Sequence, residues 1–262
     1  MMRDSDQDEM SMQLKTTLVA AAPEPAASLA RFHNRILQKA QDRSAAPVLI
    51  VALGDSVTQG LGGVDHFLHD EVYHQRLKRM LEKQYPLSIF SVINAGVDGS
   101  TAQAALERFD RDVVAHQPDL LLLGFGLNDA VLGGPAGVDD FAAGVETLIR
   151  RTRDQTDADL ILLTSNWMLS HDNDAIPDRY LHVAGKFLEV QHQGVLALYA
   201  RRLQQIAADH SLALADVYQA WQALADQGAD TTAMLANGLN HPDPRGHQLA
   251  AEVIFQTIQN HP

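Results

Sequence analysis

The sequence predicts an α/β fold in which a parallel sheet of about five strands is doubly wound, with helices on both faces. Short apolar runs alternate with amphipathic stretches along the chain, and five of these runs are continuous in apolar character, as in strands buried on both faces. Of the 262 residues, 46% are hydrophobic and 20% are charged, which is enough apolar material for a sizeable core. Buried strands separated by helices imply right-handed crossovers.

The first predicted element is a helix from residue 28 to about residue 42. Ser28 suits its N-cap and Pro47 follows its end. Its apolar stripe consists of Leu29, Phe32, Ile36 and Leu37. Residues 1–26 mix acidic and small side chains with two prolines, so we expect an acidic, disordered arm there and a single domain over residues 27–262.

The rest of the chain alternates predicted strands and helices. The strands are Val48–Leu53, Ser88–Ile93, Leu120–Leu123, Leu160–Thr164 and Leu212–Ala215. The helices are Glu71–Gln84, Thr101–His116, Val138–Gln155, Leu188–His210 and Pro244–Asn260. Because the ligand crevice of such a sheet lies at the carboxyl ends of its strands, the residues that follow each strand are the candidate site.

Charge and composition exclude several classes of function. The formal net charge of −13 disfavours binding to nucleic acid and to anionic membrane surfaces. With no cysteine, the chain has neither a thiol nucleophile nor a thiolate metal site. The acidic start, MMRDSDQDEM, is the reverse of a basic secretory signal, and no apolar run reaches the roughly 20 residues that span a bilayer. We therefore expect a cytoplasmic protein.

Four short motifs follow predicted strands or open the last helix: residues 54–60 (GDSVTQG), 94–99 (NAGVDG), 124–129 (GFGLND) and 240–247 (NHPDPRGH). Together they supply what acyl transfer needs, namely a hydroxyl nucleophile, a base and hydrogen-bond donors. Ser56 can attack a carbonyl carbon after His241 removes its proton. The backbone N–H groups of Ser56 and Gly96, with the side-chain amide of Asn128, could converge on the resulting oxyanion.

At these residues the chain resembles the SGNH/GDSL hydrolase family of serine esterases and lipases, over roughly residues 48–260. The family blocks occur in their usual order, as Gly54-Asp55-Ser56, Gly96, Gly126-Leu127-Asn128-Asp129, and His241 followed by Pro242. The resemblance implies a flavodoxin-like sheet, Ser56 as nucleophile, an oxyanion hole of Ser56, Gly96 and Asn128, and His241 as base. It implies no cofactor and no metal.

One position departs from the family pattern. Members of the family usually carry an aspartate three residues before the histidine, where this chain has Gly238. Such an acid orients the imidazole and stabilises its charged form. Three explanations stay open: a backbone carbonyl fixes the tautomer of His241 in a Ser-His dyad, an acid elsewhere such as Asp230 or Asp243 takes the role, or activity is lost.

The predicted activity is hydrolysis of short-chain acyl esters through an acyl-enzyme, with an O-acetylated carbohydrate as the first substrate candidate. One alternative is a degenerate esterase that binds a carbohydrate without cleaving it. Another is a metal-dependent phosphoesterase with ligands among Asp55, Asn128, His241, Asp243 and His247, although the motif spacing argues against it. The expected partner is a small-molecule or carbohydrate ester.

Other polar and aromatic residues have weaker assignments. By resemblance to the family's Gly-His pair, His247 is expected to be structural. Trp167 and Tyr180 lie where a wall of the substrate site could form. The remaining histidines without a motif are expected to be mostly solvated: His66, His69, His74, His171, His182 and His192.

Overall fold

The computed structural model describes residues 28–262 and contains the predicted parallel sheet of five strands. The strands are β1 (Val48–Gly54), β2 (Phe90–Gly96), β3 (Leu120–Gly124), β4 (Asp159–Leu163) and β5 (Ala213–Ala215). They are arranged in the order β2-β1-β3-β4-β5. The predicted fold class is therefore confirmed, whereas the predicted arm of residues 1–26 lies outside the described residues.

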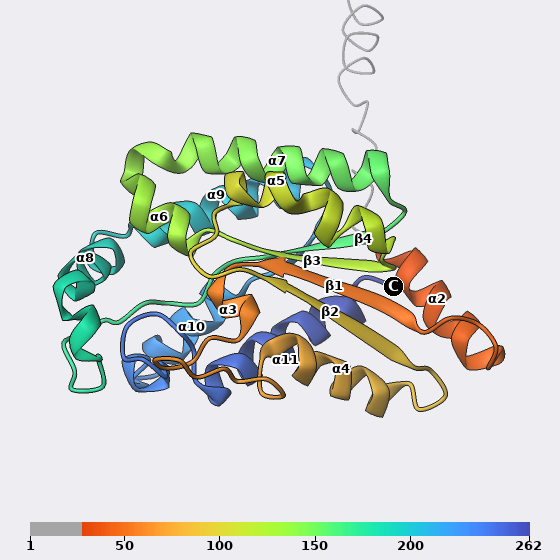
Figure 1. Cartoon of the computed structure of the whole chain (residues 1–262), viewed down its shortest axis with the longest axis horizontal. Coiled ribbons are helices and arrows are strands. Elements are labelled where there is room, and N and C mark those ends of the chain that lie inside the picture. The colour runs from red at the N-terminus through yellow and green to blue at the C-terminus, as the bar shows by residue number, and fades with distance from the viewer. Residues whose placement is uncertain (1–27) are drawn as a thin grey trace, which may run out of the picture.

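Helices cover both faces of the sheet (Figure 1). One face carries α5 (Ala102–Asp112), α7 (Val138–Gln155) and α9 (Val195–Asp209), and the other carries α4 (Tyr73–Gln84) and α11 (Pro244–Asn260). The first described helix, α2 (Ala30–Gln41), lies beside the C-terminus (Figure 1). The backbone N–H of Leu29 donates to the carbonyl of His261 at 3.1 Å, which joins the two ends of the described chain.

The central strands form the middle of the core because they have no polar side chain to solvate. Every residue of Leu120–Leu123 in β3 is buried, and nearly all of β1 is buried as well. At the carboxyl edge three glycines stand in register, because Gly54 of β1 pairs with Gly96 of β2 and with Gly124 of β3. A Cβ atom at Gly96 would lie 2.1 Å from the backbone nitrogen of Gln59, so glycine lets the turn after β1 pack against β2.

The predicted helix Leu188–His210 is wrong as a single element. The structure has α8 (Leu181–His192) and α9, separated at Gly194, whose φ of +69° breaks the helix. The predicted helix Thr101–His116 likewise ends at Asp112 and continues as a separate 3₁₀ turn, Val114–His116.

Within residues 28–262 three α-helices were not predicted: α3 (Ser56–Gln59), α6 (Leu127–Gly133) and α10 (Val217–Asp226). The first two are short and directly follow strands, so each places its first residues at the carboxyl edge of the sheet (Figure 1). Among residues 28–262 no helix has both the length and the apolar character needed to cross a membrane.

Candidate active site

Ser56 is the first residue of the single-turn helix α3, directly after strand β1. Asp55 caps this helix, because its Oδ1 accepts the N–H of Val57 at 2.9 Å. Gly60, at φ +87°, ends the turn. The backbone N–H of a first helical residue has no partner within its own helix. The N–H of Ser56 is therefore available to a ligand beside its own hydroxyl.

His241 reaches Ser56 from the other end of the domain sequence. Its Nε2 lies 2.9 Å from Ser56 Oγ, which is the distance a general base requires. Its Nδ1 lies 3.2 Å from the carbonyl oxygen of Gly62. A carbonyl can only accept, so this contact favours the tautomer with the proton on Nδ1 and the lone pair of Nε2 facing Ser56. That is the tautomer in which His241 can accept the serine proton.

The surroundings of His241 keep the imidazole neutral. Burial lowers its pKa, while the bond to the Gly62 carbonyl and the nearby carboxylate of Asp98 oppose that shift. Because the net direction is downward, the neutral form of His241 extends to more acidic pH than for an ordinary histidine.

In space, Asn237 lies beside Nδ1 of His241, where the acid of a triad would lie. It is buried, and its Nδ2 lies 3.1 Å from Nδ1 of His241. Its Oδ1 accepts the N–H groups of Leu239, Asn240 and His241, each at 3.0 Å. These three bonds fix the orientation of the amide and shape the turn that carries His241. Since Nδ2 can only donate, it favours an unprotonated Nδ1, whereas the Gly62 carbonyl favours a protonated one. The amide also brings no negative charge.

Gly238, the position expected to hold the acid, is closed to any larger side chain. Its φ is +63°, and a Cβ atom there would lie 2.3 Å from Oδ1 of Asn173. The residue of this turn that lies beside Nδ1 of His241 is Asn237, four residues before the histidine.

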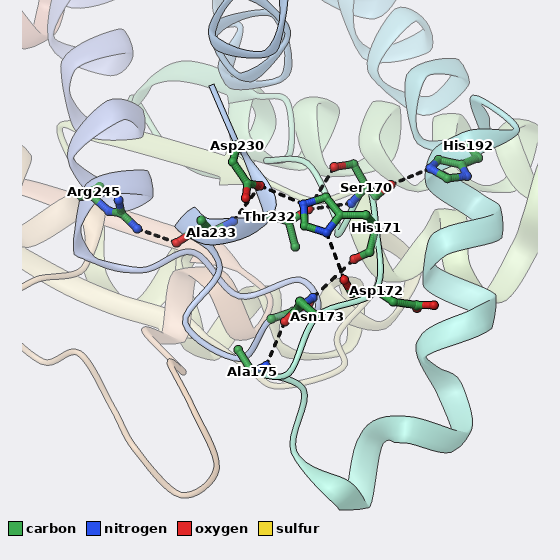
Figure 2. A network of polar contacts seen from close by, with 11 residues as sticks. Ser170, His171, Asp172, Asn173, Ala175, His192, Asp230, Thr232, Ala233 and Arg245 are labelled. Atoms are coloured by element: carbon green, nitrogen blue, oxygen red, sulfur yellow. Dashed lines mark hydrogen bonds and ion pairs between the residues drawn. The ribbon is translucent and has the colours of Figure 1, made fainter. Parts of the chain in front are cut away.

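Neither Asp230 nor Asp243 contacts His241, which corrects the expectation that one of them could orient it. Asp230 Oδ1 lies 3.0 Å from Nε2 of His171 (Figure 2). Asp243 caps α11 through the N–H groups of Arg245 and Gly246 and also pairs with the Arg245 guanidinium. Of the three explanations for Gly238, the geometry favours the backbone carbonyl.

Asn128, at the start of α6, faces the same pocket as Ser56 and His241. Its Nδ2 lies 3.1 Å from the carbonyl of Ser100 and 3.3 Å from Oδ2 of Asp55. The two contacts hold the amide group between the residue that follows β1 and the loop that follows β2. Burial raises the pKa of Asp55 to about 7, so this carboxyl is a weak competitor for the amide when it is protonated.

Gly96 is not placed as the oxyanion donor that the sequence predicted. Its N–H donates to Oδ1 of Asn94 at 2.9 Å, so it is already satisfied. Gly99, three residues later, has φ +69° and open space where a Cβ would stand, and within residues 28–262 its N–H has no hydrogen-bond partner. It lies between Asp98, which lines the pocket, and Ser100, which holds Asn128. Sequence reasoning passed over this second glycine of the NAGVDG motif, whose N–H is free to donate.

The pocket in front of Ser56 is open and has a volume of about 540 Å³. One wall comes from the 3₁₀ turn Asp178–Tyr180, with Arg179 and Tyr180, and from α8 itself, with Val183 and Phe187. Tyr180 thus lies at the wall as expected. Trp167 does not line this pocket and instead packs at a tilt against Tyr218, with ring centroids 5.7 Å apart.

Besides His241, two histidines of residues 28–262 lie in the interior. His74 is fully buried, with Nε2 3.0 Å from the Thr58 carbonyl, which corrects the expectation of a solvated side chain. Burial lowers its pKa to about 4. His247 is also buried and accepts the N–H of Tyr73 at 3.3 Å, which agrees with a structural role. In the part of the chain that the structure describes, no three His, Asp or Glu side chains gather as a metal ion would need.

Comparisons with known proteins agree with this geometry. Residues 52–249 match the GDSL-like lipase/acylhydrolase family. An acetylxylan esterase from Geobacillus stearothermophilus is 23% identical over 189 residues, which are 68% of this chain and 77% of that protein. A crystal structure of an acetylxylan esterase from the same organism has a TM-score of 0.64 at 20% identity and covers 82% of this chain and 95% of its own.

A lipase/acylhydrolase from Enterococcus faecalis is similar in structure as well, with a TM-score of 0.63 at 26% identity over 81% of this chain and 95% of that one. The family match spans well over half of the sequence and includes Ser56, Asn128 and His241. The chain therefore belongs to the GDSL-like lipase/acylhydrolase family, the SGNH/GDSL hydrolases that its motifs resemble, and is a carboxylic ester hydrolase.

Proposed function

We propose that the protein hydrolyses acyl esters through a covalent acyl-serine intermediate on Ser56. The observation that carries this proposal is the 2.9 Å contact between Ser56 Oγ and His241 Nε2, with Nδ1 of the same ring held by the Gly62 carbonyl. A hydroxyl nucleophile beside an oriented imidazole is the arrangement that activates serine.

The reaction has two half-reactions. In the first, Nε2 of His241 takes the proton of Ser56 as Oγ bonds to the ester carbon, and the imidazolium then protonates the departing alcohol. In the second, water loses its proton to His241 and attacks the acyl-enzyme, which releases the acid and returns the proton to Ser56. The N–H of Ser56, the amide of Asn128 and, in place of Gly96, the N–H of Gly99 stabilise both oxyanions.

The favoured substrate is a short acyl ester, and an O-acetylated carbohydrate is the first candidate. The similarity to an acetylxylan esterase supports this substrate class. The pocket also suits a sugar, because it is open and combines the aromatic rings of Tyr180 and Phe187 with the charged groups of Asp98 and Arg179. Rings can stack on sugar faces while charged groups bind hydroxyls.

The first test is hydrolysis of p-nitrophenyl acetate, p-nitrophenyl butyrate and acetylated xylooligosaccharides, with and without EDTA. We expect turnover that resists EDTA, prefers acetate to butyrate, and is lost in Ser56→Ala and in His241→Ala. Turnover that survives in Ser56→Ala would refute the serine mechanism. Activity removed by EDTA would favour the phosphoesterase alternative. Binding of the oligosaccharide without turnover would favour the binding protein.

A further inference from the structure

Arg108, on helix α5, connects the ends of two strands at the candidate active site. Its Nη1 donates to the carbonyl of Ala95 at 2.7 Å, and its Nη2 donates to the carbonyl of Gly54 at 2.8 Å and to Ser100 Oγ at 3.2 Å. The side chain is only 11% exposed. One buried guanidinium therefore holds the last residue of β1, the end of β2 and the loop that follows β2.

Each of these contacts lies next to a residue of the proposed mechanism. Gly54 is two residues before Ser56 in a chain that turns sharply there. Ser100 follows Gly99, and its carbonyl accepts the amide of Asn128 at 3.1 Å. The same side chain thus constrains the nucleophile turn and the loop that carries one oxyanion donor and orients another.

The guanidinium is itself fixed in place. Asp112, one helical turn further along α5, accepts from Nη1 at 2.7 Å, and its side chain is as buried as that of Arg108. The planar guanidinium can reach the two carbonyls, the hydroxyl and the carboxylate together, because its N–H groups point in several fixed directions. A lysine side chain has one nitrogen and cannot reach all four acceptors. Buried carbonyls left without these donors would cost free energy and loosen the strand ends.

We propose that Arg108 is a positioning residue of the oxyanion hole, which fixes the loop of residues 97–100 relative to Ser56 before substrate binds. This inference rests on the proposed function. A hole whose donors are held in place stabilises the transition state without reorganisation. The effect of Arg108 therefore belongs to the chemical step and not to the binding of the ground state.

The test compares Arg108→Gln and Arg108→Lys with a matched control, Arg151→Gln. Arg151, on α7, also donates to a carbonyl and pairs with a carboxylate of α5, at Leu106 and Asp110, but neither partner belongs to a strand end or to the loop of residues 97–100. In Arg108→Gln we expect kcat to fall about 10- to 100-fold, as for a displaced catalytic group, with KM changed by less than about threefold. The control should retain kcat within about threefold.

A double-mutant cycle with Asn128→Ala separates positioning from general destabilisation. If Arg108 acts through the loop that holds Asn128, then Arg108→Gln should cost markedly less in the Asn128→Ala background than alone. Equal costs in both backgrounds, or equal losses of kcat in Arg108→Gln and Arg151→Gln, would overturn the proposal.

Amide hydrogen exchange gives a measure that does not depend on activity. Loss of the guanidinium should accelerate exchange across residues 96–101 by about tenfold or more, and Arg151→Gln should not. Unchanged exchange would overturn the proposal.

If Arg108→Gln fails to fold, Arg108→Lys decides, and a wild-type kcat in that variant would overturn the proposal. Failure of the proposed function is recognised separately, since wild-type turnover would then not depend on Ser56.

Discussion

At His241 the imidazole is oriented by a backbone carbonyl in place of a carboxylate. The Gly62 carbonyl selects the tautomer that a base needs, but a neutral acceptor stabilises the imidazolium less than a full negative charge does. The site therefore orients His241 correctly but stabilises its imidazolium form less than a carboxylate would. Asn237, 3.1 Å from the same nitrogen, is the position from which that charge could be supplied.

Replacing Asn237 by Asp should create a full triad without a change in shape. One carboxylate oxygen can keep the three backbone N–H groups that Oδ1 now accepts, and the other can accept from Nδ1 of His241. Because a nearby carboxylate favours the imidazolium, the pKa of His241 should rise. The acid limb of the pH profile of kcat/KM should therefore move to higher pH, and kcat at pH 8 should rise about tenfold, as measured with p-nitrophenyl acetate.

The control for this prediction is Asn237→Ala, which removes both the amide and the three acceptor bonds. It should lower kcat, because the turn that carries His241 loses its support. An acid limb that stays in place or moves to lower pH in Asn237→Asp would show that residue 237 does not interact with the imidazole of His241.

At the scale of single residues, sequence motifs identified the side chains but not the backbone groups. Ser56, Asn128 and His241 face one pocket. Ser56 and Asn128 lie in short helices that follow strands, and His241 lies in the loop before α11. Sequence reasoning named Gly96 and not Gly99 as a donor. The two differ in whether the N–H already has a hydrogen-bond partner, and spacing carries no information about that. The role of Gly62 could not be predicted either, since it is a carbonyl and any residue has one.

At the scale of elements, the turn that carries His241 is held by the segment that follows β4. The N–H of Leu169 donates to the carbonyl of Leu239 at 2.9 Å, and Asn173 Nδ2 donates to the carbonyl of Gly238 at 2.9 Å. Thr232 Oγ1 accepts the N–H of Ser170 at 2.9 Å (Figure 2). Two loops far apart in the sequence therefore stabilise each other beside the pocket.

Gly238→Ala should weaken this pair of loops. At φ +63° an alanine costs about 1–2 kcal/mol, and its Cβ would collide with Asn173, so we expect the free energy of unfolding to fall by about 2 kcal/mol or more in urea. Gly185→Ala is the matched control. Gly185 lies within α8 with nothing near its Cβ position, so alanine should raise the free energy of unfolding by about 0.5–1 kcal/mol.

Equal effects of the two substitutions would contradict this assignment of backbone strain. Gly238→Asp should behave like Gly238→Ala and should not restore a triad, because the side chain cannot be accommodated there. Activity that increased in Gly238→Asp would show that the turn can rearrange to place the acid at His241.

Strands were easier to predict than helices for a physical reason. A strand buried on both faces needs an unbroken apolar run, which β1 and β3 show directly in sequence. The division between α8 and α9 depends on one glycine in a left-handed conformation within an otherwise helical pattern. The short helices α3 and α6 are determined by their contacts at the strand ends and have too few residues to show a period.

At the scale of the whole molecule, several ionisable groups are buried close to the active site, and burial shifts the pKa of each towards its neutral form. Burial lowers the pKa of His74 to about 4 and that of His247 to about 3, with His74 and nearby arginine charge adding to the shift at His247. Burial raises the pKa of Asp55 to about 7. Protons therefore bind differently to the folded and unfolded chains across the acidic range.

These shifts give a signed prediction for stability against pH. Below about pH 6.5 the unfolded chain protonates His74 and His247 while the folded chain does not until about pH 4 and 3, so both lower stability as the pH falls. Asp55 acts in the opposite direction, because between about pH 7 and 3.8 its carboxyl is protonated in the folded chain and ionised in the unfolded chain. Between about pH 6 and 4 these three groups give a net uptake of about one proton on unfolding, or about 1.4 kcal/mol lost per pH unit.

His247→Gln tests this balance, because it removes one of the two buried imidazoles and leaves Asp55 in place. Whatever its stability at pH 7, its free energy of unfolding in urea should fall less steeply than that of the wild type between pH 6 and 4, by about 1.4 kcal/mol per pH unit. His171→Gln is the control of opposite sign, since backbone and Asp230 contacts raise the pKa of this exposed histidine. Its loss should leave the slope nearly unchanged or slightly steeper. Parallel slopes for wild type and His247→Gln would mean that His247 is protonated in the folded protein, in which case its Nδ1 could no longer accept the N–H of Tyr73.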